Sequence, residues 1–315
     1  MVTEGKILLE LGHKRLILRK NDTVMIPMRA VHRVQGLTRK PARFIELAIG
    51  DCDENDIVRL DDDFGRGVPR TSQSTSRTRF AAPNIAIILA GGSGTRMRPI
   101  TYEIPKALMP IHGKTLTEHL INLFKKYGTR ELILSVGHLK EKIKSYFGDG
   151  SKFGVDMTYT EESEPLGTAG PIRQMKDRLT ETFIVSNGDE LKDIDIQDMY
   201  LHHKESGALV TVALTTVQDP SHYGVARLEG DRIKEFVEKP RKEDAPSNLI
   251  NAGLYIMEPE VLAYIPKGAS MLERDVFPRL AKEGKLFGYP FSGQWYDTGS
   301  FERYERALKE WKGIK

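Results

Sequence analysis

The sequence predicts an α/β fold with a doubly wound, mixed and mostly parallel sheet, preceded by a small all-β segment. Two observations support this prediction. Strand-like and helical hydrophobic patterns alternate from residue 85 to the C-terminus, which is typical of parallel strands joined by crossover helices. Residues 67–84 are rich in Ser, Thr, Gly, Pro and Arg and show no hydrophobic period, so they are interpreted as a linker between two parts.

The N-terminal part, residues 1–66, contains short strand-like stretches separated by Gly, Pro and Asn-Asp turns. Strands of this length joined by such turns are typical of a small antiparallel sheet or barrel. The stretches are KILLEL, KRLILR, TVMIPM, HRVQGL and RFIELAIG. We therefore predict one domain over residues 1–66, the linker over 67–84, and a second domain over 85–315.

The second domain begins with the apolar run from Ile85 to Leu89, which predicts a buried parallel strand. Helical and strand patterns then alternate in the order HLINLFKKYG, ELILSVG, LKEKIKSYFG, DMTYTEE, GPIRQMKDRL and FIVSNGD. In a doubly wound sheet, ligands bind beyond the carboxyl ends of the strands. We therefore expect the functional residues to be distributed along the chain but to converge at one edge of the sheet.

Composition argues against several classes of protein. The net charge is only +3 over 315 residues and no Lys/Arg-rich run stands out, which argues against a nucleic-acid partner. The single cysteine, Cys52, cannot form an internal disulfide. We find no N-terminal signal segment and no run of about 18 apolar residues, which predicts a cytoplasmic protein with no membrane partner.

A glycine-rich turn follows the first strand of the second domain. Gly91, Gly92 and Gly94 let the backbone approach a ligand closely and can direct consecutive N–H groups at phosphate oxygens. Arg96 supplies a planar fork for a phosphate, and Lys106 supplies a second positive charge. The pattern matches neither the GxxxxGK[ST] loop nor the GxGxxG motif. We infer a site for a nucleoside triphosphate.

The string LAGGSGTRMRPITYEIPKALMP, residues 89–110, resembles the signature LAGGxGTRLxPLTxxxPKxLxP of the sugar-1-phosphate nucleotidylyltransferases. The resemblance continues to the C-terminus through YTEESEPLGTAGPI, FIVSNGDEL, HYGVARL, FVEKP, NLINAGLYI and WYDTGSFERY. It is closest to the mannose-1-phosphate guanylyltransferases and implies a Rossmann-like nucleotidyltransferase fold. The implied activity is nucleotidyl transfer from an NTP to a sugar 1-phosphate, which gives an NDP-sugar and pyrophosphate.

The resemblance implies roles for individual residues of this chain. Catalysis is assigned to Arg96, Lys106 and Asp189, and a Mg²⁺ cofactor is assigned to the carboxylates of Asp189 and Asp297. Nucleotide binding is assigned to Leu89, Ala90, Gly91, Gly92, Gly94, Thr95, Arg96, Glu162, Gly167 and Thr168. Sugar-phosphate binding is assigned to Lys106, Gly224, Glu238, Lys239 and Asn251. The pair His202 and His203 matches no motif, so we expect it on the surface.

The expected chemistry needs no general base. A sugar phosphate is already ionised at neutral pH, so it can attack the α-phosphorus in line, and the site has chiefly to neutralise crowded negative charge. Magnesium held by one or two carboxylates, with phosphates and water as further ligands, suits that task.

The base and the sugar stay open between alternatives. Glu162 can accept two hydrogen bonds from the N1 and N2 donors of guanine, whereas uracil or thymine offers a single N3 donor. Together with the string EESEPLGTAGP, this favours GTP and mannose 1-phosphate. A glucose-1-phosphate uridylyl- or thymidylyltransferase is the alternative. An alternative of another class is a non-catalytic regulatory subunit that senses sugar nucleotides, but such a protein should have lost Arg96, Lys106 or a metal aspartate, and none is missing.

The N-terminal domain resembles the C-terminal half of the cupin in type II mannose-6-phosphate isomerases, through VTEGKILLEL, IPMRAVHRV and DCDENDIVRLDDDFGR. A cupin metal site takes two histidines and a carboxylate, and only His32 of such a set is present, so we expect no metal there. A half barrel leaves open strand edges. We therefore hypothesise that residues 1–66 mediate pairing into a homo-oligomer or dock on the second domain.

Overall fold

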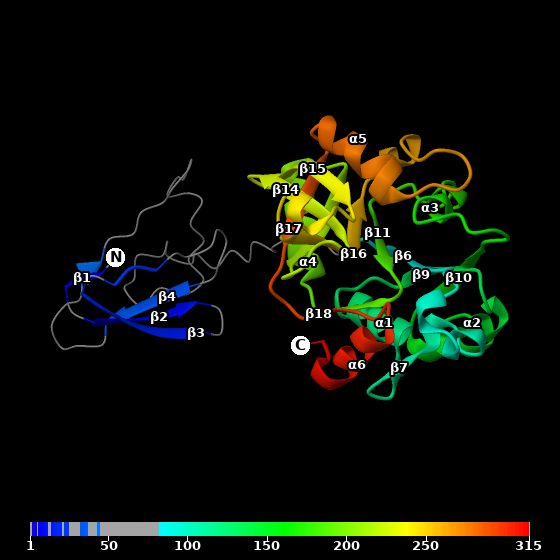
Figure 1. Cartoon of the computed structure of the whole chain (residues 1–315), viewed down its shortest axis with the longest axis horizontal. Coiled ribbons are helices and arrows are strands. Elements are labelled where there is room, and N and C mark those ends of the chain that lie inside the picture. The colour runs from blue at the N-terminus through cyan, green and yellow to red at the C-terminus, as the bar shows by residue number, and fades with distance from the viewer. Residues whose placement is uncertain are drawn as a thin grey trace, which may run out of the picture. The chain divides into compact units, whose positions relative to one another are not determined.

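The computed structural model describes residues 2–4, 6–11, 14–20, 22–24, 32–36, 43–44 and 82–314. The chain divides into two compact units, Met1–Thr75 and Ser76–Lys315, which Figure 1 draws. Cys52, the predicted linker up to residue 81 and positions 25–28 of the predicted TVMIPM strand lie outside the described residues.

The N-terminal unit is all β in its described segments. Its strands are β1 (Val2–Glu4), β2 (Lys6–Leu11), β3 (Lys14–Arg19), β4 (His32–Gly36) and β5 (Arg43–Phe44). β2 pairs antiparallel with both β3 and β4, and β1 pairs antiparallel with β5. Leu9, in the central strand β2, is buried. The small all-β segment predicted from the sequence is confirmed.

A mixed nine-stranded sheet forms the centre of the second unit. Its strands are β6 (Ile85–Ala90), β9 (Glu131–Val136), β10 (Asp156–Glu161), β11 (Phe183–Asn187), β13 (Val210–Thr216), β14 (Gly224–Glu229), β15 (Arg232–Glu238), β16 (Leu249–Met257) and β17 (Leu286–Pro290). The order is β10-β9-β6-β11-β16-β13-β17-β15-β14. Within this sheet β15 and β16 run opposite to the other strands, which confirms the predicted mixed, mostly parallel sheet.

Helices cover both faces of the sheet (Figure 1). The helices of this unit are α1 (Leu116–Lys126), α2 (Lys140–Phe147), α3 (Gly170–Gln174), α4 (Ile196–Ser206), α5 (Phe277–Lys282) and α6 (Phe301–Glu310). The buried Ala307 of α6 belongs to a separate small core with Leu191 and Trp311. Because side chains alternate along a strand, Ala86 and Ile88 of β6 belong to the core that α1, α2 and α4 close. Ile87 belongs to the core closed by α3 and α5. Among the described residues, no helix is both long and apolar enough to cross a membrane.

Helix α4 overturns the expectation for His202 and His203. Both histidines are buried, with 5% and 1% of their surface exposed, because His203 follows Met199 at a helical spacing on the face that packs on the sheet. The His203 ring is bonded through Nδ1 to the Thr211 hydroxyl at 2.8 Å and through Nε2 to Glu258 at 3.1 Å. Burial outweighs the Glu258 carboxylate and lowers the pKa of His203 to about 4.

Candidate functional site

The carboxyl ends of the parallel strands meet at one edge of the sheet, and each predicted motif of the nucleotide half begins there. β6 ends at Ala90 and continues into the turn 91–94, followed by a short 3₁₀ turn, Thr95–Met97. The Thr101 hydroxyl closes this turn by donating to the carbonyl of Gly94 at 2.9 Å. The side chain of Arg96 is exposed on the 3₁₀ turn, so it is accessible to a ligand.

Lys106 and Asp189 form an ion pair across the site. The Lys106 Nζ lies 2.6 Å from Asp189 Oδ2, with 12% of the lysine side chain and 40% of the aspartate side chain exposed. Burial opposes the ionisation of Asp189, but the charges of Lys106, Lys192 and Arg96 outweigh it and lower the pKa of the carboxyl. Asp189 is therefore a carboxylate at neutral pH.

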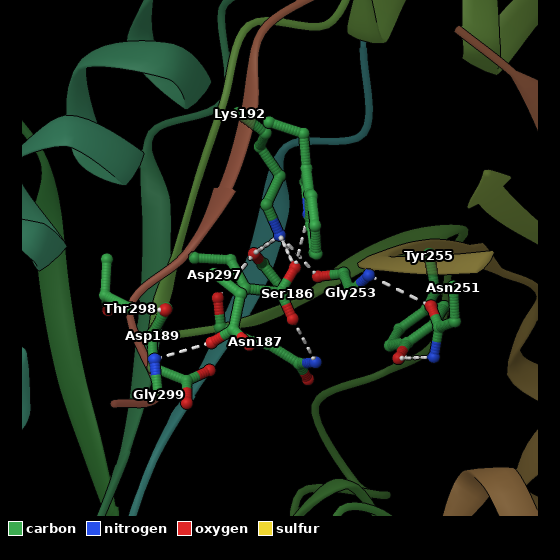
Figure 2. Close-up of polar contacts among 12 residues, drawn as sticks. Ser186, Asn187, Asp189, Lys192, Asn251, Gly253, Tyr255, Asp297, Thr298 and Gly299 are labelled. Carbon is green, nitrogen blue, oxygen red and sulfur yellow. Dashed lines mark hydrogen bonds and ion pairs between the residues drawn. The ribbon is translucent and has the colours of Figure 1, made fainter. Parts of the chain in front are cut away.

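Asp297 and Arg96 join this pair. The short strands β12 (Glu190–Lys192) and β18 (Trp295–Asp297) pair antiparallel and set Glu190 opposite Asp297. The Thr298 hydroxyl then donates to the Asp189 carbonyl at 2.7 Å. Figure 2 shows Asp189, Asp297, Thr298 and Gly299 gathered around one point. A Cβ placed on Gly299 would lie 2.8 Å from Asp297 Oδ1 and 2.9 Å from Arg96 Nη2.

Glu162 stands against the glycine turn. Its carboxylate accepts the Ser135 hydroxyl at 2.7 Å and the Leu166 N–H at 2.9 Å. A Cβ on Gly91 would come within 2.1 Å of Glu162 Oε1, so position 91 has to be glycine for this contact to exist. Each carboxylate oxygen already accepts one bond and keeps a second lone pair for a ligand.

The loop after Glu162 is anchored at both ends. Leu166 is held by Glu162, and the Thr168 hydroxyl donates to Glu273 Oε2 at 2.6 Å and accepts the Leu272 N–H at 2.9 Å. Gly167 lies between them with a φ of +74°, and a Cβ there would collide with the Ser270 carbonyl at 2.4 Å. These contacts therefore fix the loop 162–168 through Glu162 at its start and through residues 270–273 at its end.

The sugar-side residues come from the antiparallel part of the sheet. Glu238 ends β15 opposite Gly224 at the start of β14, and a Cβ on Gly224 would lie 3.0 Å from Glu238 Oε2. Lys239 is 55% exposed and pairs with Glu238 at 3.0 Å. Asn251 on β16 is buried; its Oδ1 accepts the Gly253 N–H at 2.9 Å and its Nδ2 donates to the Tyr255 hydroxyl at 2.8 Å.

A family model described as nucleotidyl transferase matches residues 85–312. The chain belongs to the nucleotidyl transferase family. A second model, described as mannose-6-phosphate isomerase C-terminal, matches residues 1–62. Both resemblances expected from the sequence are confirmed.

Curated relatives of this nucleotidyl transferase differ in the substrates named for them. The chain is 39% identical over 220 residues to the mannose-1-phosphate guanylyltransferase catalytic subunit beta of Danio rerio, which covers 68% of this chain and 61% of the relative. It is 38% identical over 241 residues to a UTP-glucose-1-phosphate uridylyltransferase of Synechocystis, with coverage of 71% and 62%. The chain thus spans about three fifths of the length of these relatives.

Solved structures share the fold. A UDP-glucose pyrophosphorylase in complex with UDP-glucose is 28% identical, with a TM-score of 0.64 over 72% of this chain and 97% of that chain. The α/β nucleotidyltransferase fold predicted from the sequence is confirmed by this likeness.

The two aspartates of this nucleotidyl transferase offer carboxylate oxygens suited to a hard divalent cation. Among the described residues there is no cluster of three or more His, Cys, Asp or Glu side chains fit to hold a metal, but Mg²⁺ usually takes only one or two carboxylates together with substrate phosphates and water. Asp189 is ionised, and Asp297 is oriented by the Gly299 N–H at 2.6 Å and by the guanidinium of Arg303. The donor set fits a hard divalent cation completed by phosphate oxygens.

A buried network behind the aspartates was not predicted from the sequence. Lys192 has a fully buried side chain and donates to the Gly253 carbonyl at 2.7 Å, while its Nζ lies 3.4 Å from Glu190 Oε2. Glu190 also accepts from Trp295 Nε1 at 2.9 Å. Burial raises the pKa of Glu190 and lowers that of Lys192. Sequence reasoning missed Lys192, Arg303 and Glu273, because a single charged residue in a short strand or a helix carries no local sign of a distant partner.

Proposed function

We propose that the chain transfers a nucleotidyl group from a nucleoside triphosphate to a sugar 1-phosphate. A phosphate oxygen of the sugar phosphate forms a bond to the α-phosphorus, and the bond from that phosphorus to the bridging oxygen of the β-phosphate breaks. Pyrophosphate leaves, and an NDP-sugar remains. The observation that carries this proposal is the meeting of Arg96, Lys106, Asp189 and Asp297 at one point beyond the strand ends.

Each assigned group has a part in that reaction. Arg96 and the turn 91–94 bind the triphosphate and hold the leaving pyrophosphate, and Lys106 neutralises charge near the reacting phosphates. Asp189 and Asp297 would hold Mg²⁺, which supplies further charge neutralisation when it is bound. Glu238, Lys239, Gly224 and Asn251 bind the sugar phosphate, with the second N–H of the Asn251 amide still available to a ligand.

GTP and mannose 1-phosphate are the substrates we favour. Two carboxylate oxygens of Glu162 beside the nucleotide turn match the N1 and N2 donors of guanine. A relative named as a mannose-1-phosphate guanylyltransferase and the isomerase-like N-terminal match support the same choice. The cytoplasmic location and the homo-oligomeric state remain predictions from the sequence.

A uridylyltransferase acting on glucose 1-phosphate is the second candidate, since a relative at 38% identity carries that name. Pyrophosphate release from a panel of GTP, UTP, dTTP, ATP and CTP with mannose 1-phosphate or glucose 1-phosphate distinguishes the two. We expect GTP with mannose 1-phosphate to give the highest kcat/KM in the presence of Mg²⁺. Faster release from UTP would contradict the guanine assignment, and no release from any pair would leave the sensing subunit as the better interpretation.

A further inference from the structure

Glu273 is a buried carboxylate that the proposed reaction does not use. It lies in a π-helical turn, Leu272–Val276, with 6% of its surface exposed. One oxygen, Oε2, accepts the Thr168 hydroxyl at 2.6 Å, and the other, Oε1, accepts the Tyr255 hydroxyl at 3.4 Å. A buried carboxylate is costly unless its oxygens are hydrogen-bonded, and here each oxygen has a hydroxyl partner from a different part of the site.

The hydroxyl groups of Tyr255 and Thr168 connect Glu273 to the proposed sugar subsite and to the nucleotide loop 162–168, respectively. Tyr255 accepts from Asn251 Nδ2 at 2.8 Å, a contact drawn in Figure 2. The Asn251 amide is itself fixed by the Gly253 N–H, so the Tyr255 proton is left to point at Glu273. On the other side, Thr168 accepts from the Leu272 N–H at 2.9 Å, which directs its own proton at Glu273. A continuous line of hydrogen bonds therefore runs from Asn251 to the loop 162–168.

We propose that Glu273 is a positioning residue that couples the sugar subsite to the nucleotide loop. The inference rests on the proposed function, which assigns Asn251 to the sugar phosphate, and on the prediction from the sequence that Thr168 binds the nucleotide. A ligand that bonds to the Asn251 amide changes its bond to Tyr255, and Glu273 passes that change to Thr168. Because coupling between sites is reciprocal for binding, the nucleotide must change the affinity for the sugar phosphate by the same factor.

A double-mutant cycle tests this coupling. Thr168→Val and Tyr255→Phe remove one hydroxyl at each end of the line, and each variant is measured alone and in combination. We expect Thr168→Val to raise the KM for the sugar phosphate, and Tyr255→Phe to raise the KM for the nucleotide, by about fivefold each, which corresponds to the lower end of allosteric couplings. In the double variant the increases should not multiply.

Two matched controls lie outside the site. Thr182→Val removes a threonine hydroxyl bonded to Glu258 at 2.8 Å, and Tyr264→Phe removes a tyrosine hydroxyl bonded to Glu283 at 2.6 Å. We expect both controls to leave both KM values unchanged. Thermal unfolding of all variants shows whether a change in KM merely follows a loss of stability.

The coupling is overturned if each variant changes only the KM of its own substrate, or if the effects multiply in the double variant. Calorimetric titration measures the Kd of the nucleotide with and without sugar phosphate. Repeated on each variant, it gives the same double-mutant cycle from binding alone, independently of turnover. A chain that binds both ligands but releases no pyrophosphate would therefore refute the proposed function while the coupling is still measured. Conversely, normal turnover together with KM increases that multiply in the double variant would refute only the coupling.

Discussion

The ammonium of Lys106 lies 2.6 Å from the carboxylate of Asp189, although 83 residues separate them in the sequence. The ion pair joins the segment 89–110, which follows β6, to the residues that follow β11. These two parts of the predicted triphosphate site are therefore held at a fixed distance from each other. Lys106 and Asp189 therefore neutralise each other's charge in the absence of substrate. The effects of replacing either residue must therefore be divided between binding, turnover and stability.

We expect Asp189→Asn to lower turnover by about 100-fold or more, the usual cost of losing one strong electrostatic contact to a transition state. Nucleotide binding, measured by calorimetry, should stay nearly intact, because Arg96 and the turn 91–94 are unchanged. Asp195→Asn is the control, since Asp195 caps α4 through the Asp198 N–H and asparagine caps a helix equally well. Full turnover in Asp189→Asn would show that Asp189 is not a metal ligand.

Replacing Glu162 with glutamine tests the choice of base. Glutamine keeps one acceptor but turns the other oxygen into a donor, which faces a donor of guanine. An unpaired polar contact of this kind costs about 1–3 kcal/mol, so the ratio of kcat/KM for GTP over UTP should fall by about tenfold. The exposed Glu164→Gln is the control. An unchanged ratio would remove Glu162 from base recognition.

Stability should fall in mild acid because of His203. The unfolded chain takes up a proton on this ring near pH 6.5, but the folded chain does so only near its pKa of about 4. Stability is therefore highest above pH 6.5 and decreases as the pH drops toward 4, by up to about 3 kcal/mol. Urea unfolding at several pH values measures the slope, and His203→Asn should flatten it. A wild-type chain equally stable at pH 7 and pH 5 would contradict the buried neutral ring.

Lys192→Met should be strongly destabilising, by about 3 kcal/mol, because it leaves the buried Glu190 without its cation. The double variant Glu190→Gln with Lys192→Met removes both charges and should recover part of that loss. Lys144→Met is the control, since Lys144 pairs with the exposed Glu161 and surface pairs contribute less than about 1 kcal/mol. Additive losses in the double variant would mean that the two side chains do not stabilise each other.

Deletion of residues 1–66 addresses the N-terminal unit. The second unit has its own core on both sides of its sheet, so we expect the shortened chain to fold. If the N-terminal strands pair with another copy, the deletion should lower the oligomeric state seen by light scattering. An identical oligomeric state together with an identical melting temperature would reject an interaction role for this unit.

The local parts of the site were predictable from the sequence. The glycine turn follows an apolar strand directly, so the position of Arg96 beyond β6 follows from chain order alone. The same holds for Asp189 after β11. By contrast, the contact between Glu162 and Gly91 depends on β10 and β6 lying on either side of β9, and no local pattern specifies that arrangement.

The misses have physical causes. His202 and His203 look like surface residues by type, yet the buried face of α4 includes both of them, and hydrogen bonds to Thr211 and Glu258 make the burial of His203 tolerable. Lys192 follows an acidic turn and resembles a solvated residue, but Gly253 and Glu190 supply its partners from another strand and from its own. The burial of these polar side chains is determined by tertiary contacts and not by the residue type.

The contact of Glu162 with Gly91 fixes the position of one carboxylate relative to the glycine turn. Under the proposed function, the Glu162 carboxylate binds the base and the backbone of the turn 91–94 binds the phosphates. The protein therefore fixes the distance between the base-binding group and the phosphate-binding group. A displacement of the turn 91–94 would therefore also displace Glu162, so that under the proposed function the selection of the base depends on how the phosphates are bound.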